Sequence, residues 1–236
     1  SVCESTGWLP IHINLDDSAG GGFMPLYLKT HSMGEYVFDY VWANAYHHHG
    51  FDYYPKLVSA IPFTPSSGPR TRNEKGIDRA QSMSFLDKVY EKSDIYKASS
   101  WHLLFPDDSA LEAFADLNLL HRLGIQYQWF NYGFQTFDDF LASLNSRKRK
   151  MIRRERSEIG AQKIETETLF GQDISQEIWD FFYNLYQRTY AKRSGSPGYL
   201  NSRFFTLIGK SMPDQIAMAV ARISGEPIAC ALYFFD

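Results

Sequence analysis

The sequence predicts an α/β (α+β) protein with mixed, mostly antiparallel sheets, and three observations lead to this prediction. Two pairs of apolar runs, each separated by turn residues, have the pattern of β-hairpins. Between them, helical apolar periodicity alternates with short strand-like runs. Hydrophobic residues make up 44% and charged residues 22% of the 236 residues, which is close to the globular average and excludes general disorder.

The two predicted hairpins lie near the two ends of the chain. The first joins residues 11–15 to 23–29, and the second joins residues 216–223 to 227–235. They are about 205 positions apart, so one interpretation is a weak internal duplication. The other interpretation is that hairpins are ordinary parts of a single mixed fold. Spacing alone leaves both interpretations open.

Between the hairpins we expect helices and strands to alternate. Helices are expected where apolar residues recur every three or four positions, and strands where short apolar runs are bounded by turn residues. The expected helices are 36–49, 78–96, 106–123, 136–152, 175–192 and 203–212. The expected strands are 56–63, 101–105, 125–131 and 163–169.

Two of the expected helices carry start signals. Ser109 and Glu112 have the spacing of a capping box, and Gly124 is expected to stop the helix that they open. Thr136 and Asp139 open the following helix, in which apolar residues are expected to continue along one face to residue 152.

Composition and the chain ends exclude several classes of protein. No apolar run approaches the roughly 18–20 residues that a membrane-spanning helix needs. The two cysteines, Cys3 and Cys230, lie near opposite ends, which argues against a disulfide scaffold and favours a reducing compartment. No signal-peptide pattern begins at Ser1, so we expect a cytoplasmic protein. The chain stops directly after the apolar run 229–235, so we expect it to be a piece of a longer protein.

The most charged segment is residues 147–156, with seven basic residues and one acid in a chain whose formal net charge is −3. On a helix, Arg149, Arg153 and Arg156 share one face, while Met151 continues an apolar face that is expected to be buried. One interpretation is a site for phosphate or a polyanion such as a nucleotide, coenzyme A, a lipid pyrophosphate or transfer RNA. The other is a solvated helix face paired with the acidic remainder.

Other signals for chemistry are weak. His47, His48 and His49 are consecutive, so on a helix they point about 100° apart and cannot converge on one metal ion. No metal site is therefore expected. No nucleophile elbow is present. DNA binding is not expected either, because the chain is acidic and has no helix-turn-helix or zinc-finger spacing.

A second candidate site lies where the chain leaves the first hairpin and enters a helix. Such strand-to-helix loops are where ligands commonly dock in α/β proteins. Glu35 and Asp39 lie a helical turn apart, and His31 can be oriented by either. The other expected members at this strand end are Tyr53, Tyr54 and Lys56. Arg70 is a separate candidate, because the loop of residues 66–70 follows a strand and would place it near an anion. Capping and surface hydrogen bonds are the alternative interpretation for each.

Several strings of residues are more specific than these general patterns. They are residues 25–32, 34–39, 53–57, 62–65, 68–70, 126–129 and 146–156. Together they resemble the FemAB-like predicted N-acyltransferases, which are bacterial proteins related to the peptidoglycan-bridge aminoacyltransferases. Gln128 stands where the family often has histidine, which puts an essential proton-transfer role at that position in doubt.

The resemblance implies two tandem folds of the GCN5-related N-acetyltransferase (GNAT) type. Residues 1–145 would form the first GNAT-like domain without its N-terminal part. Residues 146–236 would hold the basic helix and the first half of an incomplete second domain. The acetyl-coenzyme A signature of the wider superfamily is absent from both halves.

The function implied is acyl or aminoacyl transfer to an amine, linked to peptidoglycan or other cell-envelope precursors. No tightly bound cofactor is expected. Acyl-CoA or aminoacyl-tRNA would be the phosphate-bearing donor, with an amine as acceptor and peripheral contact with a lipid-linked precursor. The alternative is a non-catalytic GNAT-like module that binds RNA or an anionic envelope precursor.

For the transfer reaction, we expect Glu35 or Asp39 to be the base, with His31 as helper or alternative base. Tyr53 or Tyr54 is expected to donate a hydrogen bond to the oxyanion or leaving group. The donor or the precursor would be held by the basic side chains. These are Lys56, Arg70, Arg147, Lys148, Arg149, Lys150, Arg153 and Arg154.

Overall fold

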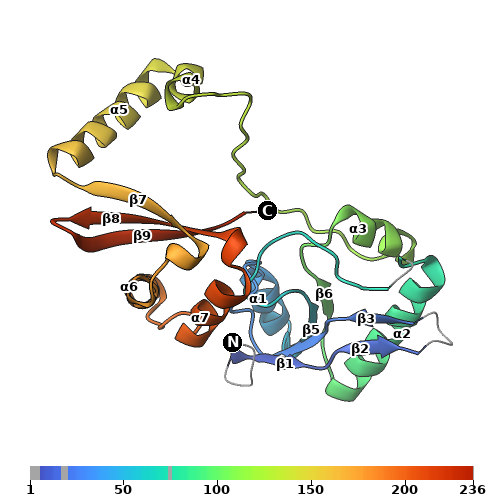
Figure 1. Cartoon of the computed structure of the whole chain (residues 1–236). Coiled ribbons are helices and arrows are strands. Elements are labelled where there is room, and N and C mark those ends of the chain that lie inside the picture. Colours follow the sequence, from blue (N-terminus) through green and yellow to red (C-terminus); the bar gives the residue numbers. More distant parts are fainter. Residues whose placement is uncertain (1–5, 17–20, 74–75, 236) are drawn as a thin grey trace. The chain divides into compact units, whose positions relative to one another are not determined.

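A computed structural model describes residues 6–16, 21–73 and 76–235 of the chain (Figure 1). The chain divides into two compact units, Ser1–Leu123 and Gly124–Asp236. The expected boundary between two GNAT-like domains, after residue 145, stays a prediction. Cys3 lies outside the described residues. Within the described part, seven α-helices and three mostly antiparallel sheets confirm the mixed α/β class.

The first unit contains a four-stranded sheet of order β1-β4-β5-β6 and a separate hairpin, β2-β3. Its pairings are antiparallel except for β5 with β6, which is parallel. The strands are β1 (Trp8–Pro10), β2 (Ile13–Leu15), β3 (Gly22–Met24), β4 (Tyr27–Lys29), β5 (Lys56–Ser59) and β6 (Trp101–Leu103). The helices are α1 (Tyr40–His48), α2 (Arg79–Tyr96) and α3 (Asp108–Phe114), which continues into the 3-10 turn η3 (Ala115–Leu117).

The core of the first unit forms around α2 and the strands. The amide N–H of Gln81 donates to Asp78 Oδ1, and Gln81 Oε1 accepts from the Asp78 N–H, so a capping box starts α2. The core side chains are Ile13, Leu15, Met24, Leu26, Leu57, Phe85, Val89 and Phe114. Because side chains alternate along a strand, Leu57 enters this core while Lys56 lies on the opposite face of β5.

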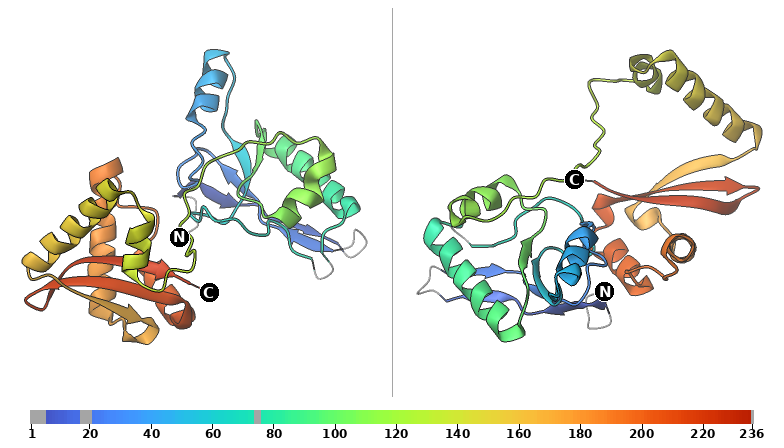
Figure 2. Two further views of the ribbon diagram at one scale, coloured as in Figure 1. Left: turned by 90° about the horizontal axis from the view of Figure 1, so that it is seen from above. Right: turned by 180° about the vertical axis from the view of Figure 1, so that it is seen from behind.

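The second unit has one antiparallel sheet of order β7-β8-β9. Its strands are β7 (Glu165–Phe170), β8 (Ile216–Ile223) and β9 (Glu226–Phe234). Its helices are α4 (Phe137–Ser143), α5 (Ser146–Ala161), α6 (Gln176–Ser194) and α7 (Ser202–Ser211), with 3-10 turns η4 (Gly171–Asp173) and η5 (Pro213–Gln215). Apolar side chains of α6 and α7 pack on β8 through Ile178, Trp179, Phe205, Ile216, Met218 and Val220. Figures 1 and 2 show these two helices on one face of the sheet.

Both predicted hairpins are confirmed, although the first is divided. Its second run breaks into β3 and β4 around Pro25 and Leu26, and β4 pairs with β1 and β5 instead of with β2. In the second hairpin, β8 and β9 pair along their lengths and turn through Ser224 and Gly225, which both have positive φ. This matches the short turn that the sequence predicts.

The expected strand at 125–131 is wrong. Residues 118–131 have no regular secondary structure and form an extended run (Figure 2). Leu123 is 95% and Tyr127 is 96% exposed. A strand exists only where its backbone pairs with a neighbour, and none of the three described sheets pairs with this segment.

The single helix expected over 136–152 is divided in the structure. Thr136 and Asp139 form the capping box that starts α4, as predicted. Leu144 is extended (ψ 156°), and Asn145 Oδ1 accepts the N–H of Lys148 at 2.9 Å and caps a new helix, α5. No α5 residue is buried, so the expected burial of Met151 is also wrong.

Three other element ends differ from the prediction. Asp107 Oδ1, not Ser109, caps α3 by accepting the N–H of Ala110, and α3 ends at Phe114, well before residue 123. Helix α1 begins four residues later than expected, because the preceding loop turns through residues with positive φ, including Tyr36. Strand β5 ends at Ser59, where the chain enters a proline-rich loop.

Candidate functional site

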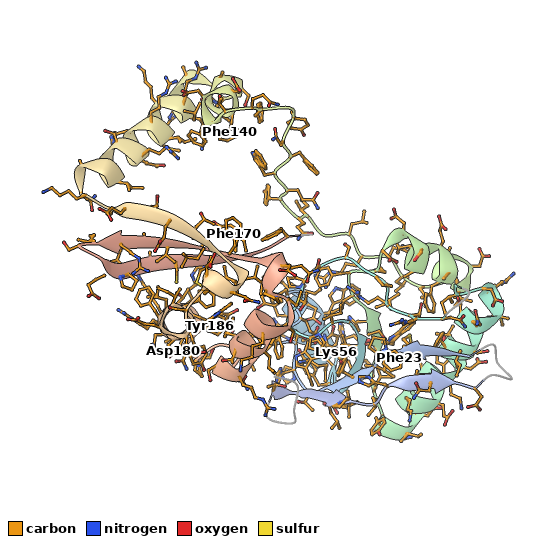
Figure 3. All side chains as sticks on the ribbon, in the orientation of Figure 1. Phe23, Lys56, Phe140, Phe170, Asp180 and Tyr186 are labelled. Atoms are coloured by element: carbon orange, nitrogen blue, oxygen red, sulfur yellow. The ribbon has the colours of Figure 1, made fainter. Side chains whose placement is uncertain are left out.

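Two lysines lie directly opposite each other in the first unit. Lys29 of β4 and Lys56 of β5 are register partners in an antiparallel pair, and neither is exposed to solvent (Figure 3 labels Lys56). Like charges at such positions repel, and burial removes the water that would screen them. The pair therefore requires other groups to compensate its charge.

The loop between β4 and α1 supplies the compensating carboxylates. Gly34 has φ +80°, and a Cβ there would lie 2.5 Å from the ring of Phe63, so the tight turn requires glycine. This turn brings Glu35 and Asp39 over β5. Asp39 occupies the N-cap position of α1, but its side chain makes no capping hydrogen bond, because it is directed to Lys56.

Lys56 is the centre of a buried hydrogen-bond network. Its Nζ donates to Glu35 Oε2 at 2.8 Å and to Ser32 Oγ at 2.8 Å. The third donation goes to Asp39 Oδ2. An ammonium group has three donors, so these partners satisfy Lys56 completely. The Glu35, Asp39 and Lys56 side chains are at most 1% exposed.

Two tyrosines extend this network. Tyr53 Oη donates to Asp39 Oδ2 at 2.7 Å, and burial together with this bond raises the pKa of Tyr53, so the phenol stays protonated. Tyr54 Oη and Ser32 Oγ share a hydrogen bond of 2.8 Å. Unlike the carboxylates, Ser32 and Tyr54 are half-buried. A continuous path of hydrogen bonds therefore joins the surface to the buried carboxylates.

The pKa values of the charged groups reflect burial opposed by mutual attraction. Burial lowers the pKa of Lys29 to about 8, against the attraction of Glu35. Lys29 Nζ also lies 4.1 Å from the centre of the Trp8 ring and donates to the Met33 carbonyl. Burial raises the pKa of Glu35 in spite of the nearby Lys56. The four charges, two of each sign, balance formally.

Asp39 differs from Glu35 in its pKa. Burial would raise the pKa of Asp39, but hydrogen bonds, above all from Lys56, hold it below its ordinary value. Glu35 is therefore the stronger base of the two. One oxygen of each carboxylate, Glu35 Oε1 and Asp39 Oδ1, is buried without a hydrogen-bond partner in the structure.

Two histidines lie beside the network. His102 of β6 contacts Ser100 Oγ at 2.9 Å, and burial, with the charge of Lys56, lowers its pKa to about 4. Burial likewise lowers the pKa of His31, and Lys29 adds to the effect. His31 Nδ1 accepts the N–H of Met33 at 3.2 Å, so the proton of the neutral ring is on Nε2. This tautomer makes His31 a hydrogen-bond donor.

Among the residues expected for catalysis and binding, the structure brings together Glu35, Asp39, Tyr53, Tyr54 and Lys56, with His31 adjacent. Sequence analysis assigned no role to Lys29, Ser32 and His102. Lys29 belongs to the site because it pairs with Lys56 across β4 and β5, and this register is not visible in the sequence. Ser32 lies inside a string that the sequence singled out. His102 has no local signal, because β6 becomes a neighbour only through its parallel pairing with β5.

Arg70 lies in a different environment from Lys56. Its guanidinium is fully buried and donates to the carbonyls of Leu104 (2.6 Å), Ser66 (2.7 Å), Gly68 (3.0 Å) and Pro69 (3.1 Å). These bonds fasten the loop after β5 to the chain that follows β6. This geometry gives Arg70 a structural role in that loop.

The basic residues of α5 belong to the second unit and fall into two groups. Arg149 donates to the Leu144 carbonyl at 3.0 Å, and Arg153 forms a 3.4 Å ion pair with Asp138. Arg156 stacks over Phe137 at 4.3 Å. These three side chains therefore contact α4 or the turn that follows it.

The second group on α5 lines a surface depression of about 300 Å³. Its members are Arg147, Lys150, Met151, Arg154 and Glu155. Arg147, Lys150 and Arg154 have the i, i+3, i+7 spacing of one helix face. Arg154 forms an exposed ion pair with Glu158 at 2.9 Å. Lys148 is also exposed. This face is the part of α5 that remains available to a ligand.

The described residues hold neither a metal-ligand cluster nor a membrane-spanning helix. Among residues 6–16, 21–73 and 76–235, no cluster of three or more histidine, cysteine or acidic side chains has a geometry for a metal ion. None of the helices in the described part of the chain combines the length and hydrophobicity that crossing a bilayer requires.

Comparison with known families matches the chain to a family model. No curated protein matches the chain. A family model described as FemAB-like, peptidoglycan biosynthesis/recognition, matches residues 1–236, the whole chain. The strings that carried the resemblance include those that build the Lys56 network, namely 34–39 and 53–57. The chain therefore belongs to the FemAB-like family of peptidoglycan biosynthesis and recognition proteins.

Proposed function

We propose that the protein is an N-acyltransferase that moves an acyl or aminoacyl group to an amine of a peptidoglycan or other envelope precursor. The observation that carries this proposal is the hydrogen-bonded path from half-buried Ser32 through Lys56 to the buried carboxylate of Glu35. Acyl transfer to an amine requires removal of a proton from the attacking nitrogen. A base with a raised pKa at the end of such a path suits this requirement.

In the proposed step, the nitrogen of the acceptor attacks the acyl carbonyl carbon, and the bond to the donor's leaving group breaks. Lys56 first passes a proton to Glu35, which leaves its nitrogen neutral with a lone pair. This nitrogen then accepts the hydroxyl proton of Ser32, while Ser32 Oγ takes the proton of the attacking nitrogen. Ser32 and Lys56 end with the protons they began with, and Glu35 ends protonated. Asp39, whose pKa is lowered, stays ionised and balances the charge of Lys56.

In this proposal, two half-buried groups assist at the carbonyl. The Nε2–H of His31 and the Tyr54 hydroxyl are hydrogen-bond donors, and donors of this kind stabilise the oxyanion of a tetrahedral intermediate. Tyr53 serves as a positioning residue through its bond to Asp39. His31 thus takes a donor role, and the base role falls to Glu35.

The donor carries phosphate in this proposal, as acyl-CoA or aminoacyl-tRNA, and the protein works in the cytoplasm. Arg147, Lys150 and Arg154 on the free face of α5, together with the exposed Lys148, would bind the phosphates. Two tandem GNAT-like domains, divided after residue 145, are the fold that we propose for the complete protein. Family membership supports this proposal.

The test is a transfer assay with the purified protein. Acetyl-CoA and alanyl-tRNA are offered as donors to a lysine-containing peptide, and the acceptor is weighed by mass spectrometry. We expect Glu35→Gln and Ser32→Ala to slow transfer by about 100-fold or more. We expect the wild-type rate to rise with pH through a pKa above the usual range of glutamate.

Glu91→Gln is the matched control, because Glu91 is an exposed glutamate that pairs with Lys88 on α2. Circular dichroism of each variant confirms that it is folded. Ser32→Ala removes one hydroxyl and keeps all four charges, so it tests the path without breaking the ion pairs. Undiminished transfer by both Glu35→Gln and Ser32→Ala would exclude this mechanism.

A second candidate function is binding without chemistry. Saturation of all three Lys56 donors favours it, because a saturated ammonium group has no donor left for a substrate. In that case RNA or an anionic envelope precursor would bind the free face of α5. Affinity would fall steeply with salt concentration, and no donor would be consumed.

A further inference from the structure

A pocket in the first unit is lined by none of the residues of the Lys56 network. Its volume is about 920 Å³, within the size range of small-ligand sites. One wall comes from residues 69–73, 76, 77 and 79 and the other from α3 and η3, and Phe23 of β3 also lines the pocket. Apart from Arg70, none of the residues that the sequence predicts for catalysis or binding lines this pocket.

The two walls carry opposite charges. Arg72 and Arg79 lie on the first wall, and Glu112 and Asp116 lie on the second, all with exposed side chains. Within the described residues, none of these four side chains takes part in an ion pair within 4.0 Å. Among the described residues, charges of both signs therefore face one pocket without an ion-pair partner.

Helix dipoles make these charges more unfavourable. Arg79 is the first residue of α2, where the positive end of the dipole disfavours a cation. Glu112 lies in the last turn of α3, where the negative end disfavours an anion. Asp116 follows it by four residues, so the two acids also repel each other. A ligand that brings an anion to Arg79 and a cation to Glu112 offsets both unfavourable dipole interactions and the repulsion between the two acids.

The backbone at Arg72 is held in place by hydrogen bonds. Arg72 and Phe23 exchange two backbone hydrogen bonds, of 2.8 and 2.9 Å, and Arg70 ties the same loop to Leu104. Phe23, Ile77 and Leu117 add apolar surface to the lining. The pocket thus offers cations, carboxylates and an apolar surface together.

We propose that this pocket binds a short peptide or amino acid with a free carboxylate, a free ammonium group and an aliphatic body. Arginine forks bind the carboxylate, the acids of α3 bind the ammonium, and the apolar lining covers the body. A polyphosphate is disfavoured because Glu112 and Asp116 would repel it, and a polyamine is disfavoured because the arginines would repel it. This site is additional to the proposed acyl-transfer site and does not depend on it.

Trialanine tests the proposal, because its termini carry the two charges and its side chains are aliphatic. Calorimetric titration compares trialanine with N-acetyl-trialanine, which lacks the ammonium, and with trialanine amide, which lacks the carboxylate. We expect each capped peptide to bind about ten-fold or more weakly, since each loses a charge-assisted hydrogen bond.

Variants of the two walls test which wall binds the carboxylate of the peptide and which binds its ammonium group. Arg72→Gln with Arg79→Gln should weaken trialanine about ten-fold or more, yet leave trialanine amide unchanged. Glu112→Gln with Asp116→Asn should weaken trialanine in the same way, yet leave N-acetyl-trialanine unchanged. Lys88→Gln and Asp87→Asn, which alter α2 outside the pocket, are the matched controls and should change nothing.

Three results would overturn the proposal. The first is no heat of binding with trialanine at millimolar concentration, and the second is equal binding of the three peptides. The third is equal weakening of all three peptides by both pairs of variants, which would show that the two walls do not bind different termini of the peptide. Unchanged circular dichroism in the variants, whose substituted side chains are exposed, separates lost binding from lost folding.

Discussion

Lys56 Nζ donates a 2.8 Å hydrogen bond to Glu35 Oε2, and the two side chains are completely buried. Taking both charges out of water costs several kcal/mol per ion, which their attraction and further hydrogen bonds offset. Asp39 and Ser32 complete the set of partners around Lys56. This bond joins the loop before α1 to the middle of the sheet, so the candidate site and the stability of the first unit depend on the same contact.

Replacing Lys56 should destabilise the first unit strongly. Lys56→Met leaves Glu35 and Asp39 buried without their cation, so we expect a loss of about 3–5 kcal/mol in the free energy of unfolding. Hydrogen–deuterium exchange of peptides that cover β5 measures this loss for the first unit alone. Lys88→Met breaks an exposed ion pair, which water and salt already screen, and should leave the exchange of these peptides unchanged. Equal effects of the two variants would contradict a buried charge centre at Lys56.

His102 should make the stability of the first unit depend on pH. Burial and Lys56 lower its pKa to about 4 in the folded state, whereas the unfolded chain binds the proton near 6.5. Between these values the unfolded state holds more protons, so stability rises as pH rises from 4 to 6.5. His102→Gln should flatten the stability profile in that range.

The same exchange measurement at pH 4, 5 and 6.5 provides the profile. His48→Gln is the matched control, because His48 is exposed at the end of α1. It should leave the profile unchanged. A slope that persists in His102→Gln would assign the pH dependence to other groups.

Arg70 should act through the architecture of its loop. Arg70→Lys keeps the positive charge but cannot reach four carbonyls with one ammonium group, so buried acceptors lose their donors. We expect a loss of about 1–3 kcal/mol in the stability of the first unit. Thermal unfolding measures it, with Arg79→Lys as the exposed control. A fully stable Arg70→Lys variant would show that the carbonyl contacts are dispensable.

Two triple variants separate the two groups of basic residues on α5. Changing Arg147, Lys150 and Arg154 to glutamine should weaken tRNA binding and make its salt dependence shallower, because counterion release scales with the phosphates neutralised. Changing Arg149, Arg153 and Arg156 to glutamine removes the same charge from side chains that contact α4 or the turn that follows it. This second set should weaken tRNA binding less and loosen the packing of α4.

Fluorescence anisotropy at several salt concentrations compares the tRNA affinities of the two triple variants. Identical curves would mean that only total charge matters.

Predictions from the sequence succeeded where a local rule decides the structure. The capping box at Thr136 and the hairpin of β8 and β9 depend on residues close in sequence, so their patterns were sufficient. The extended run through Tyr127 has the composition of a strand but no partner in the described sheets, and pairing is a non-local property. The break between α4 and α5 was missed because Asn145 as a cap competes with a continuous apolar pattern.

For the candidate site, the sequence by itself determined which groups gather, because Glu35, Asp39, Tyr53 and Lys56 lie in short strings beside one strand end. It also determined the concentration of positive charge on one helix. Only the tertiary structure decided that Lys56 is the centre, since strand register brings it opposite Lys29 and burial then forces it to pair with carboxylates. Register, burial and pKa depend on residues distant in the chain.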